Sequence, residues 1–151
     1  MRVRDLLARE LVAVDADAPL HTIADKMRAQ DVGMIPILSA GKAVGVVTDR
    51  DLVLRVLAPI SEPSIMTAWD VMSRDPICID EEATLERAAE VMQERRVRRL
   101  IVIGHDGTPK GVVSLSDLSR YSEKALEVMR LLSIKPHNIR YPEKPIGARR
   151  I

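Results

Sequence analysis

Hydrophobic and polar positions follow the same order twice along this chain of 151 residues. A shift of 65 residues, which becomes 66 after one inserted residue, aligns identical residues of the two copies. Examples are Asp5 with Asp70, Leu20 with Leu85, Met27 with Met92 and Asp51 with Asp117. The insertion falls where Gly41-Lys42 faces a longer turn sequence, and surface turns tolerate insertions. The pattern therefore indicates an internal duplication.

Each copy predicts the same series of elements. A short apolar segment, 11–14 or 77–79, is typical of a strand, and apolar residues then recur at helical spacing over 20–27 and 85–92. Pro19 and Thr84 suit helix starts. Two more strands are predicted at 34–38 and 43–48, and at 100–103 and 111–114, with a second helix from Asp49 or Leu115. Each copy is therefore an expected βαββα unit of the α/β class.

The second helices differ between the copies. Residues 52–58 are apolar on almost every helical face, whereas the later helix is expected to run from Asp117 through Tyr121 to Leu132. The expected organisation is repeat 1 over 1–58, a linker over 59–67, repeat 2 with an extended C-terminal helix over 68–132, and a basic, proline-containing tail over 133–151.

Composition and charge exclude several classes of protein. Phe is absent and aromatic residues make up 2%, which disfavours binding of nucleic acid by base stacking. The net charge is +1, although the tail holds five basic residues against Glu143 alone. Because Tyr141 is the only aromatic residue of the tail, we do not expect the tail to bind nucleic acid; packing against a dimer partner is the alternative role. No apolar run approaches the roughly 20 residues of a membrane helix, and no signal peptide is evident, so we expect a cytoplasmic protein.

Few residues suggest catalysis or metal binding. The single cysteine, Cys78, excludes an intramolecular disulfide framework and a cysteine-based zinc cluster. His21, His105 and His137 lack the spacing of metal ligands. We therefore expect no catalytic residue, no metal and no required cofactor.

The best-matched motif is Gly-x-x-Thr/Ser-x-x-Asp, which occurs once in each copy as Gly45, Thr48 and Asp51, and as Gly111, Ser114 and Asp117. One interpretation is structural, because a hydroxyl followed by an acidic residue three positions later forms a capping box. The other is ligand binding. A helix start and a hydroxyl suit phosphate, and a carboxylate can accept both hydroxyls of a ribose.

Together, the duplication, the βαββα pattern and this motif resemble a tandem cystathionine-β-synthase (CBS) domain pair, or Bateman module. The segments 31–37 and 45–51 are especially similar to bacterial stand-alone pairs. The resemblance covers about residues 3–122. It implies two repeats related by a pseudo-twofold axis and packed through their sheets, a homodimer, and clefts for AMP, ADP, ATP or S-adenosylmethionine.

The resemblance also implies roles for particular residues. Asp51 and Asp117 would bind ribose, and Thr48 and Ser114 would contact ribose or phosphate. The backbone around Val12 and Val14, and around Ile77 and Ile79, would read adenine, between apolar walls that include Ile35 and Leu100. Arg98 and Arg99, which replace Gly33 and Met34 of the first copy, are candidates for polyphosphate binding, as is Arg50. Solvated arginines or ion pairs are the alternative.

The sequence therefore predicts a non-enzymatic regulatory module that binds an adenosine-containing ligand and signals to a separate protein through changed packing. The alternative is a dimeric interaction module whose ligand sites are vestigial.

Overall fold

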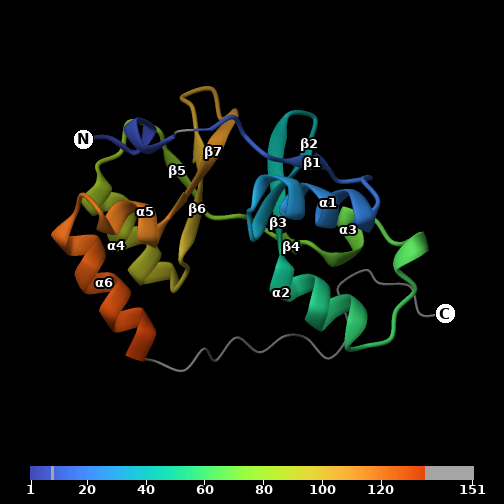
Figure 1. Cartoon of the computed structure of the whole chain (residues 1–151). Coiled ribbons are helices and arrows are strands. Elements are labelled where there is room, and N and C mark those ends of the chain that lie inside the picture. Colours follow the sequence, from blue (N-terminus) through green and yellow to red (C-terminus); the bar gives the residue numbers. More distant parts are fainter. Residues whose placement is uncertain (8, 135–151) are drawn as a thin grey trace. The chain divides into compact units, whose positions relative to one another are not determined.

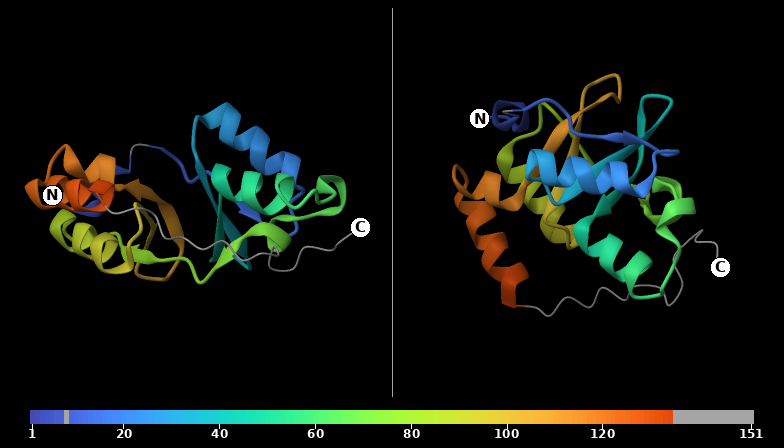
Figure 2. Two further views of the ribbon diagram at one scale, coloured as in Figure 1. Left: turned by 90° about the horizontal axis from the view of Figure 1, so that it is seen from below. Right: turned by 45° about the vertical axis from the view of Figure 1, so that its right-hand side comes forward.

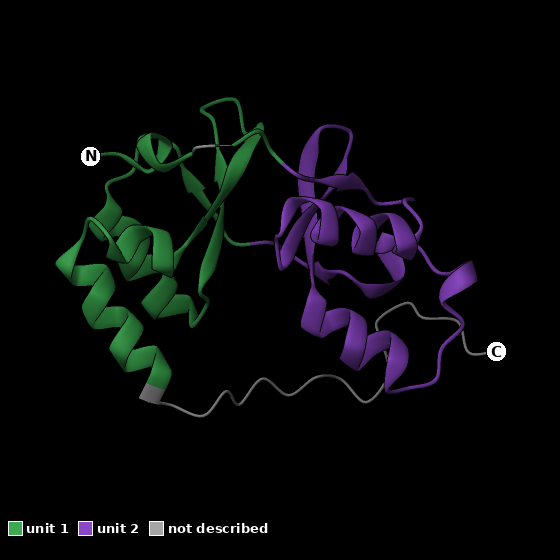
Figure 3. Ribbon diagram, viewed as in Figure 1, with its two compact units in different colours: residues 1–11, 77–138 green, residues 12–76, 139–151 purple. Residues whose placement is uncertain are grey.

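The computed structural model describes residues 1–7 and 9–134 and divides them into two compact units. Unit 1 contains Met1–Leu11 together with the described chain from Ile77 onward, and unit 2 contains Val12–Pro76 (Figure 3). Each unit has one sheet and its own helices, as the predicted α/β class requires.

Unit 2 is built on a four-stranded sheet with the order β1-β2-β3-β4, in which β1 is parallel to β2 and the other pairs are antiparallel (Figure 1). Its elements are β1 (Val14–Asp15), α1 (Leu20–Gln30), β2 (Met34–Ser39), β3 (Lys42–Thr48), α2 (Asp49–Leu52), the π-helical η2 (Val53–Leu57), the 3-10 helix η3 (Pro63–Ile65), α3 (Ala68–Val71) and β4 (Ser73–Arg74).

Unit 1 has a three-stranded sheet with the order β5-β6-β7, again parallel in its first pair and antiparallel in its second. Helices α4, α5 and α6 lie on one side of this sheet (Figure 2). The elements are the 3-10 helix η1 (Val3–Leu6), β5 (Cys78–Asp80), α4 (Leu85–Arg95), β6 (Arg99–Ile103), β7 (Pro109–Ser114), α5 (Leu115–Ser119) and α6 (Glu123–Ile134).

Helices α1 and α4 show how the repeat fixes local structure. Thr84 caps α4 by accepting the N–H of Arg87 at 3.1 Å, while Pro19 begins α1 without a side-chain cap. Both helices end in a left-handed residue, Asp31 with φ 51° and Arg96 with φ 54°. The two copies therefore stop their first helix in the same way and turn into β2 or β6.

Each unit has its own hydrophobic core of aliphatic side chains and methionine. In α4 all four residues of the predicted apolar face are buried, but in α1 Ala24 is exposed and Met27 is half-buried. The fully buried side chains of the unit 2 core include Ile23, Ile35, Ile37 and Val47, and those of the unit 1 core include Met92, Leu100, Val102 and Leu118.

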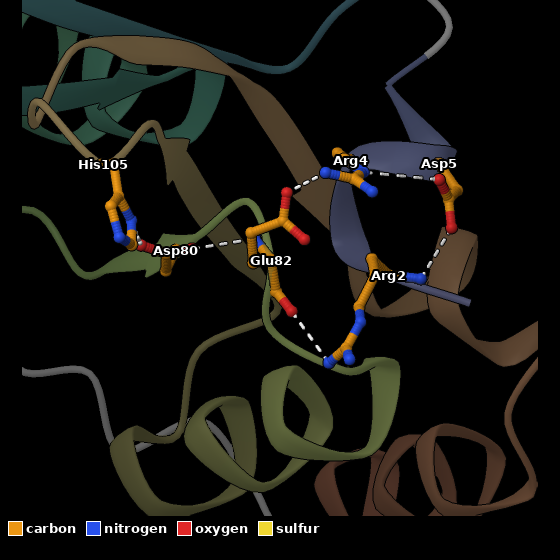
Figure 4. A network of polar contacts seen from close by, with 6 residues as sticks. All are labelled: Arg2, Arg4, Asp5, Asp80, Glu82 and His105. Atoms are coloured by element: carbon orange, nitrogen blue, oxygen red, sulfur yellow. Dashed lines mark hydrogen bonds and ion pairs between the residues drawn. The ribbon is translucent and has the colours of Figure 1, made fainter.

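The N-terminal residues complete unit 1, although they belong to the first sequence repeat. Val3 is fully buried in the unit 1 core, and its N–H donates to the carbonyl of Ala83 at 2.9 Å. Arg2 donates to the carbonyl of Glu82 at 3.0 Å, and Arg4 forms an ion pair with the Glu82 carboxylate (Figure 4). The segment is thus fixed by both apolar burial and polar contacts.

The equivalent residues of the second repeat complete unit 2. The N–H groups of Ala68 and Trp69, in α3, donate to the carbonyls of Ala18 and Ala16, both at 2.9 Å. Strand β4 then pairs with β3, with Gly45 opposite Arg74. Relative to the sequence repeats 1–58 and 68–132, each compact unit therefore contains the first residues of the other repeat. Residues 1–11 lie in unit 1 and residues 68–76 lie in unit 2, and we call these two stretches the lead-in segments.

The predicted βαββα order is confirmed in both units, and one local expectation is wrong. The extended C-terminal helix is two helices, because the chain turns at Tyr121 between α5 and α6. In the apolar segment 52–58, Val56 is buried within unit 2, while Val53 and Leu57 are exposed. Most of the basic tail, from residue 135, lies outside the described residues.

Candidate functional site

Both copies of the Gly-x-x-Thr/Ser-x-x-Asp motif form the turn from a strand into a helix. Between β3 and α2, the Asp51 N–H donates to Thr48 Oγ1 at 3.1 Å, and the Asp51 carboxylate accepts the Thr48 N–H at 2.8 Å. Between β7 and α5, the corresponding Ser114 and Asp117 bonds are 3.1 and 2.9 Å, and the Ser114 hydroxyl also donates to Asp117 at 2.6 Å. Both motifs are therefore formed capping boxes.

The capping boxes change the expectation for phosphate. Each uses one early helical N–H, that of Asp51 or Asp117, to bond the capping hydroxyl. Helices α2 and α5 are also short, with four and five residues. The chemistry that these junctions offer a ligand therefore lies in the carboxylates and hydroxyls and in the side chains beside them.

In unit 1 the sheet register gathers several predicted site residues at one end. Arg99 is the cross-strand partner of Ser114, and Leu100 is the partner of Val113. The carbonyl of Ile77, beside β5, accepts the N–H of Ile101 at 3.1 Å. Edge strand β5, the first residues of β6 and the motif at the end of β7 therefore occupy the same end of the sheet.

Unit 2 repeats this geometry with different side chains. Met34 stands opposite Thr48, where Arg99 stands opposite Ser114 in unit 1, and Ile35 is the partner of Val47. Edge strand β1 pairs with β2 through Val14 and Ile37, and Val12 precedes this strand. The first copy thus places an apolar residue where the second places a cation.

The predicted apolar walls are core residues. Ile35 and Leu100 are fully buried within the cores of their units, and Val14 and Ile79 are also buried. Val12 and Ile77 are half-buried and pack against the same cores. The structure supports a role for these residues in holding the junctions, and their contact with adenine stays a prediction.

The three candidate arginines are all exposed, in different settings. Arg50 lies in α2, within the first motif. Arg98 donates to the carbonyl of Leu132 in α6 at 3.3 Å, while Arg99 begins β6 opposite Ser114. Neighbouring Arg98 and Arg99 therefore have different surroundings, as the alternation of side chains in an extended segment predicts.

Sequence reasoning missed Arg55, in η2. Its side chain is only 8% exposed, donates to the carbonyl of Val71 at 2.8 Å and to Ser73 Oγ at 2.9 Å, and lies 3.8 Å from the Asp51 carboxylate. The available signal was a single charged residue inside the apolar run 52–58, where burial requires polar partners.

The described residues hold no group of three or more His, Cys, Asp or Glu side chains that could bind a metal ion. His21 is exposed in α1, and His105 lies at the surface, 3.2 Å from the Asp80 carboxylate. Cys78 is half-buried in β5, and burial raises the pKa of its thiol. No described helix is long and apolar enough to cross a membrane.

Comparison with known proteins places this geometry in a family. The CBS domain model matches twice, over residues 3–58 and 68–124. The chain is 32% identical over 120 residues to uncharacterised protein YlbB of Bacillus subtilis, covering 78% of this chain and 80% of that protein. Hypoxic response protein 1 of Mycobacterium tuberculosis is also 32% identical over 120 residues, with 78% and 82% covered.

A solved structure gives the same result. CBS domain protein PAE2072 of Pyrobaculum aerophilum, complexed with AMP, superimposes with a TM-score of 0.74 at 26% identity, covering 86% of this chain and 99% of that one. The two family matches fall on the two copies that the sequence repeat defines and include both capping-box junctions. The chain therefore belongs to the CBS domain family and carries two CBS domains in tandem.

Proposed function

We propose that this CBS domain pair is a non-enzymatic regulatory module that binds an adenosine-containing ligand. The observation that carries the proposal is the duplicated junction, in which a hydroxyl and a carboxylate lie together at the end of a strand. Similarity to a CBS domain protein whose structure contains AMP supports the choice of ligand class.

The chemistry of the junction suits a nucleoside. A carboxylate accepts hydrogen bonds from neighbouring ribose hydroxyls, which fixes the sugar in one orientation. Aliphatic side chains offer adenine apolar contact but not the roughly 1–3 kcal/mol per base that aromatic stacking gives. Specificity would then depend on the carboxylates and on backbone polar groups at the adjoining strand edges β1 and β5.

A thermal-shift panel with AMP, ADP, ATP and S-adenosylmethionine tests the proposal on the full chain. A ligand at 100 times its Kd adds about 2.7 kcal/mol of stability, which raises the Tm by about 5–10 °C at this chain length. Isothermal titration calorimetry then measures Kd for each compound that shifts the Tm.

Matched variants separate binding from capping. We expect a chain with both Asp51→Asn and Asp117→Asn to lose ligand binding. Asp70→Asn is the control, because Asp70 accepts the Thr67 N–H at 2.8 Å in a third capping box, outside the two junctions. It should lower the Tm and leave ligand affinity unchanged. If none of the four compounds binds the wild-type chain, the interaction-module alternative is favoured instead.

Signalling in this proposal requires a second state and a reader. Bound ligand would favour one packing of the module, and a separate regulated protein would bind that state. Self-association into a homodimer is part of the same proposal. Light scattering after size-exclusion chromatography, with and without the ligand, measures it directly.

A further inference from the structure

The two junctions differ in the access that they give to their carboxylates. Asp51 is only 4% exposed, whereas Asp117 is half-buried at the equivalent position. One Asp51 oxygen accepts the Thr48 N–H, and the other lies 3.8 Å from Nη2 of Arg55. A ribose hydroxyl must approach a carboxylate oxygen to about 2.7 Å. At the first junction, both oxygens of the Asp51 carboxylate therefore already contact groups of unit 2.

Those contacts serve the packing of unit 2. Arg55 connects Asp51 to the end of α3, through the carbonyl of Val71, and to the start of β4, through Ser73 Oγ. A buried charge is tolerated only when it is paired and hydrogen-bonded, and removing one partner leaves the other uncompensated. Asp51 therefore acts as the counter-charge of the arginine that secures β4.

The second junction differs at the position of Arg55. The residue at the position of Arg55 is Tyr121, which lies in the turn after α5, is 60% exposed and brings no positive charge to Asp117. Arg99, in place of Met34, stands opposite the capping residue Ser114. The first junction also has an exposed arginine, Arg50, but beside a buried carboxylate, whereas the second combines the more accessible carboxylate with a cation across the strand pair.

We propose that each chain binds one adenine nucleotide, at the Ser114–Asp117 junction, with Arg99 contacting its phosphate, while Asp51 is a structural anchor for Arg55 and β4. This inference rests on the proposed function and specifies which of the two junctions performs it.

Titration calorimetry of the full chain with AMP tests the assignment. We expect one AMP per wild-type chain and no detectable binding to Asp117→Asn. We expect Asp51→Asn to retain the wild-type Kd within about twofold but to melt at least about 4 °C lower, because it weakens a buried ion pair.

Arginine variants test the phosphate contact. Arg99→Gln should weaken AMP binding about tenfold, the scale of a charge-assisted hydrogen bond. Adenosine, which has no phosphate, should bind this variant and the wild type equally. Arg98→Gln is the matched control, since Arg98 donates to the Leu132 carbonyl, and it should leave the Kd for AMP unchanged.

Two bound AMP molecules per wild-type chain would overturn the assignment. So would full binding to Asp117→Asn, or loss of AMP binding from a folded Asp51→Asn chain. If Asp51→Asn does not fold, the wild-type stoichiometry and the Asp117→Asn titration still decide the question. A wild-type chain that binds none of the adenosine compounds contradicts the proposed function itself, which is a different result from binding at the wrong junction.

Discussion

Replacing Gly45 by alanine should loosen the pairing of β3 with β4. A Cβ atom at this position would lie 2.6 Å from Met72 Sδ and 2.7 Å from the carbonyl oxygen of Ser73. Such overpacking costs about 1–3 kcal/mol, and alanine recovers about 0.4–1 kcal/mol by restricting the unfolded chain. We therefore expect a net loss of about 1–2 kcal/mol, or a Tm lower by about 2–8 °C.

Gly111→Ala is the matched substitution in the other copy. There the added Cβ meets Leu7 Cδ2 at 2.7 Å, and this is the end of a half-buried, flexible side chain. The side chain can rotate away, whereas the Ser73 carbonyl is part of the sheet. We expect this variant to remain within about 0.5 kcal/mol of the wild type.

Urea unfolding monitored by fluorescence is suited to the Gly45 variant. Trp69 is the only tryptophan of the sequence. The guanidinium carbon of Arg74, the cross-strand partner of Gly45, lies 4.3 Å from the centroid of the Trp69 ring. Its emission therefore reports the affected region of unit 2, while circular dichroism follows both variants. A Gly45→Ala chain as stable as the wild type, or a larger loss from Gly111→Ala, would refute the reasoning.

Two further predictions concern unit 1. Val3→Ala should lower the free energy of unfolding by about 2 kcal/mol, because Val3 is fully buried in the unit 1 core. Urea denaturation measures this change. Val53→Ala is the control, since Val53 is 51% exposed, and it should change the free energy of unfolding by less than about 0.5 kcal/mol. Burial raises the pKa of Cys78, so its thiolate forms at higher pH than in the unfolded chain. The rate of its reaction with a disulfide reagent should therefore rise at a higher pH in the folded chain than in the urea-unfolded chain. Profiles with the same midpoint pH would contradict the burial.

The sequence was sufficient to predict the elements that local patterns encode. Apolar residues at helical spacing mark α4, and a hydroxyl with an acidic residue three positions later marks the starts of α2 and α5. These features depend on residues close together in the chain. The repeat strengthened each prediction, because the same pattern appeared twice.

Features that depend on distant residues were not predictable in this way. Nothing near Val3 indicates that its N–H bonds to Ala83, 80 residues later. The partners of Arg55, in α3 and β4, are also remote in sequence. The resemblance gave Asp51 and Asp117 the same role, because aligned positions carry no information about burial, and burial is where the two residues differ.

The exchanged lead-in segments have a consequence for the order of folding during synthesis. Residues 12–76 of unit 2 are contiguous, so this unit can fold as soon as they have left the ribosome. Met1–Leu11 emerge before unit 2 but must wait for the partners of Val3 in β6, β7 and α4. Closing such a long loop is slow. Residues 1–11 are therefore synthesised before unit 2 but reach their final place after it has folded.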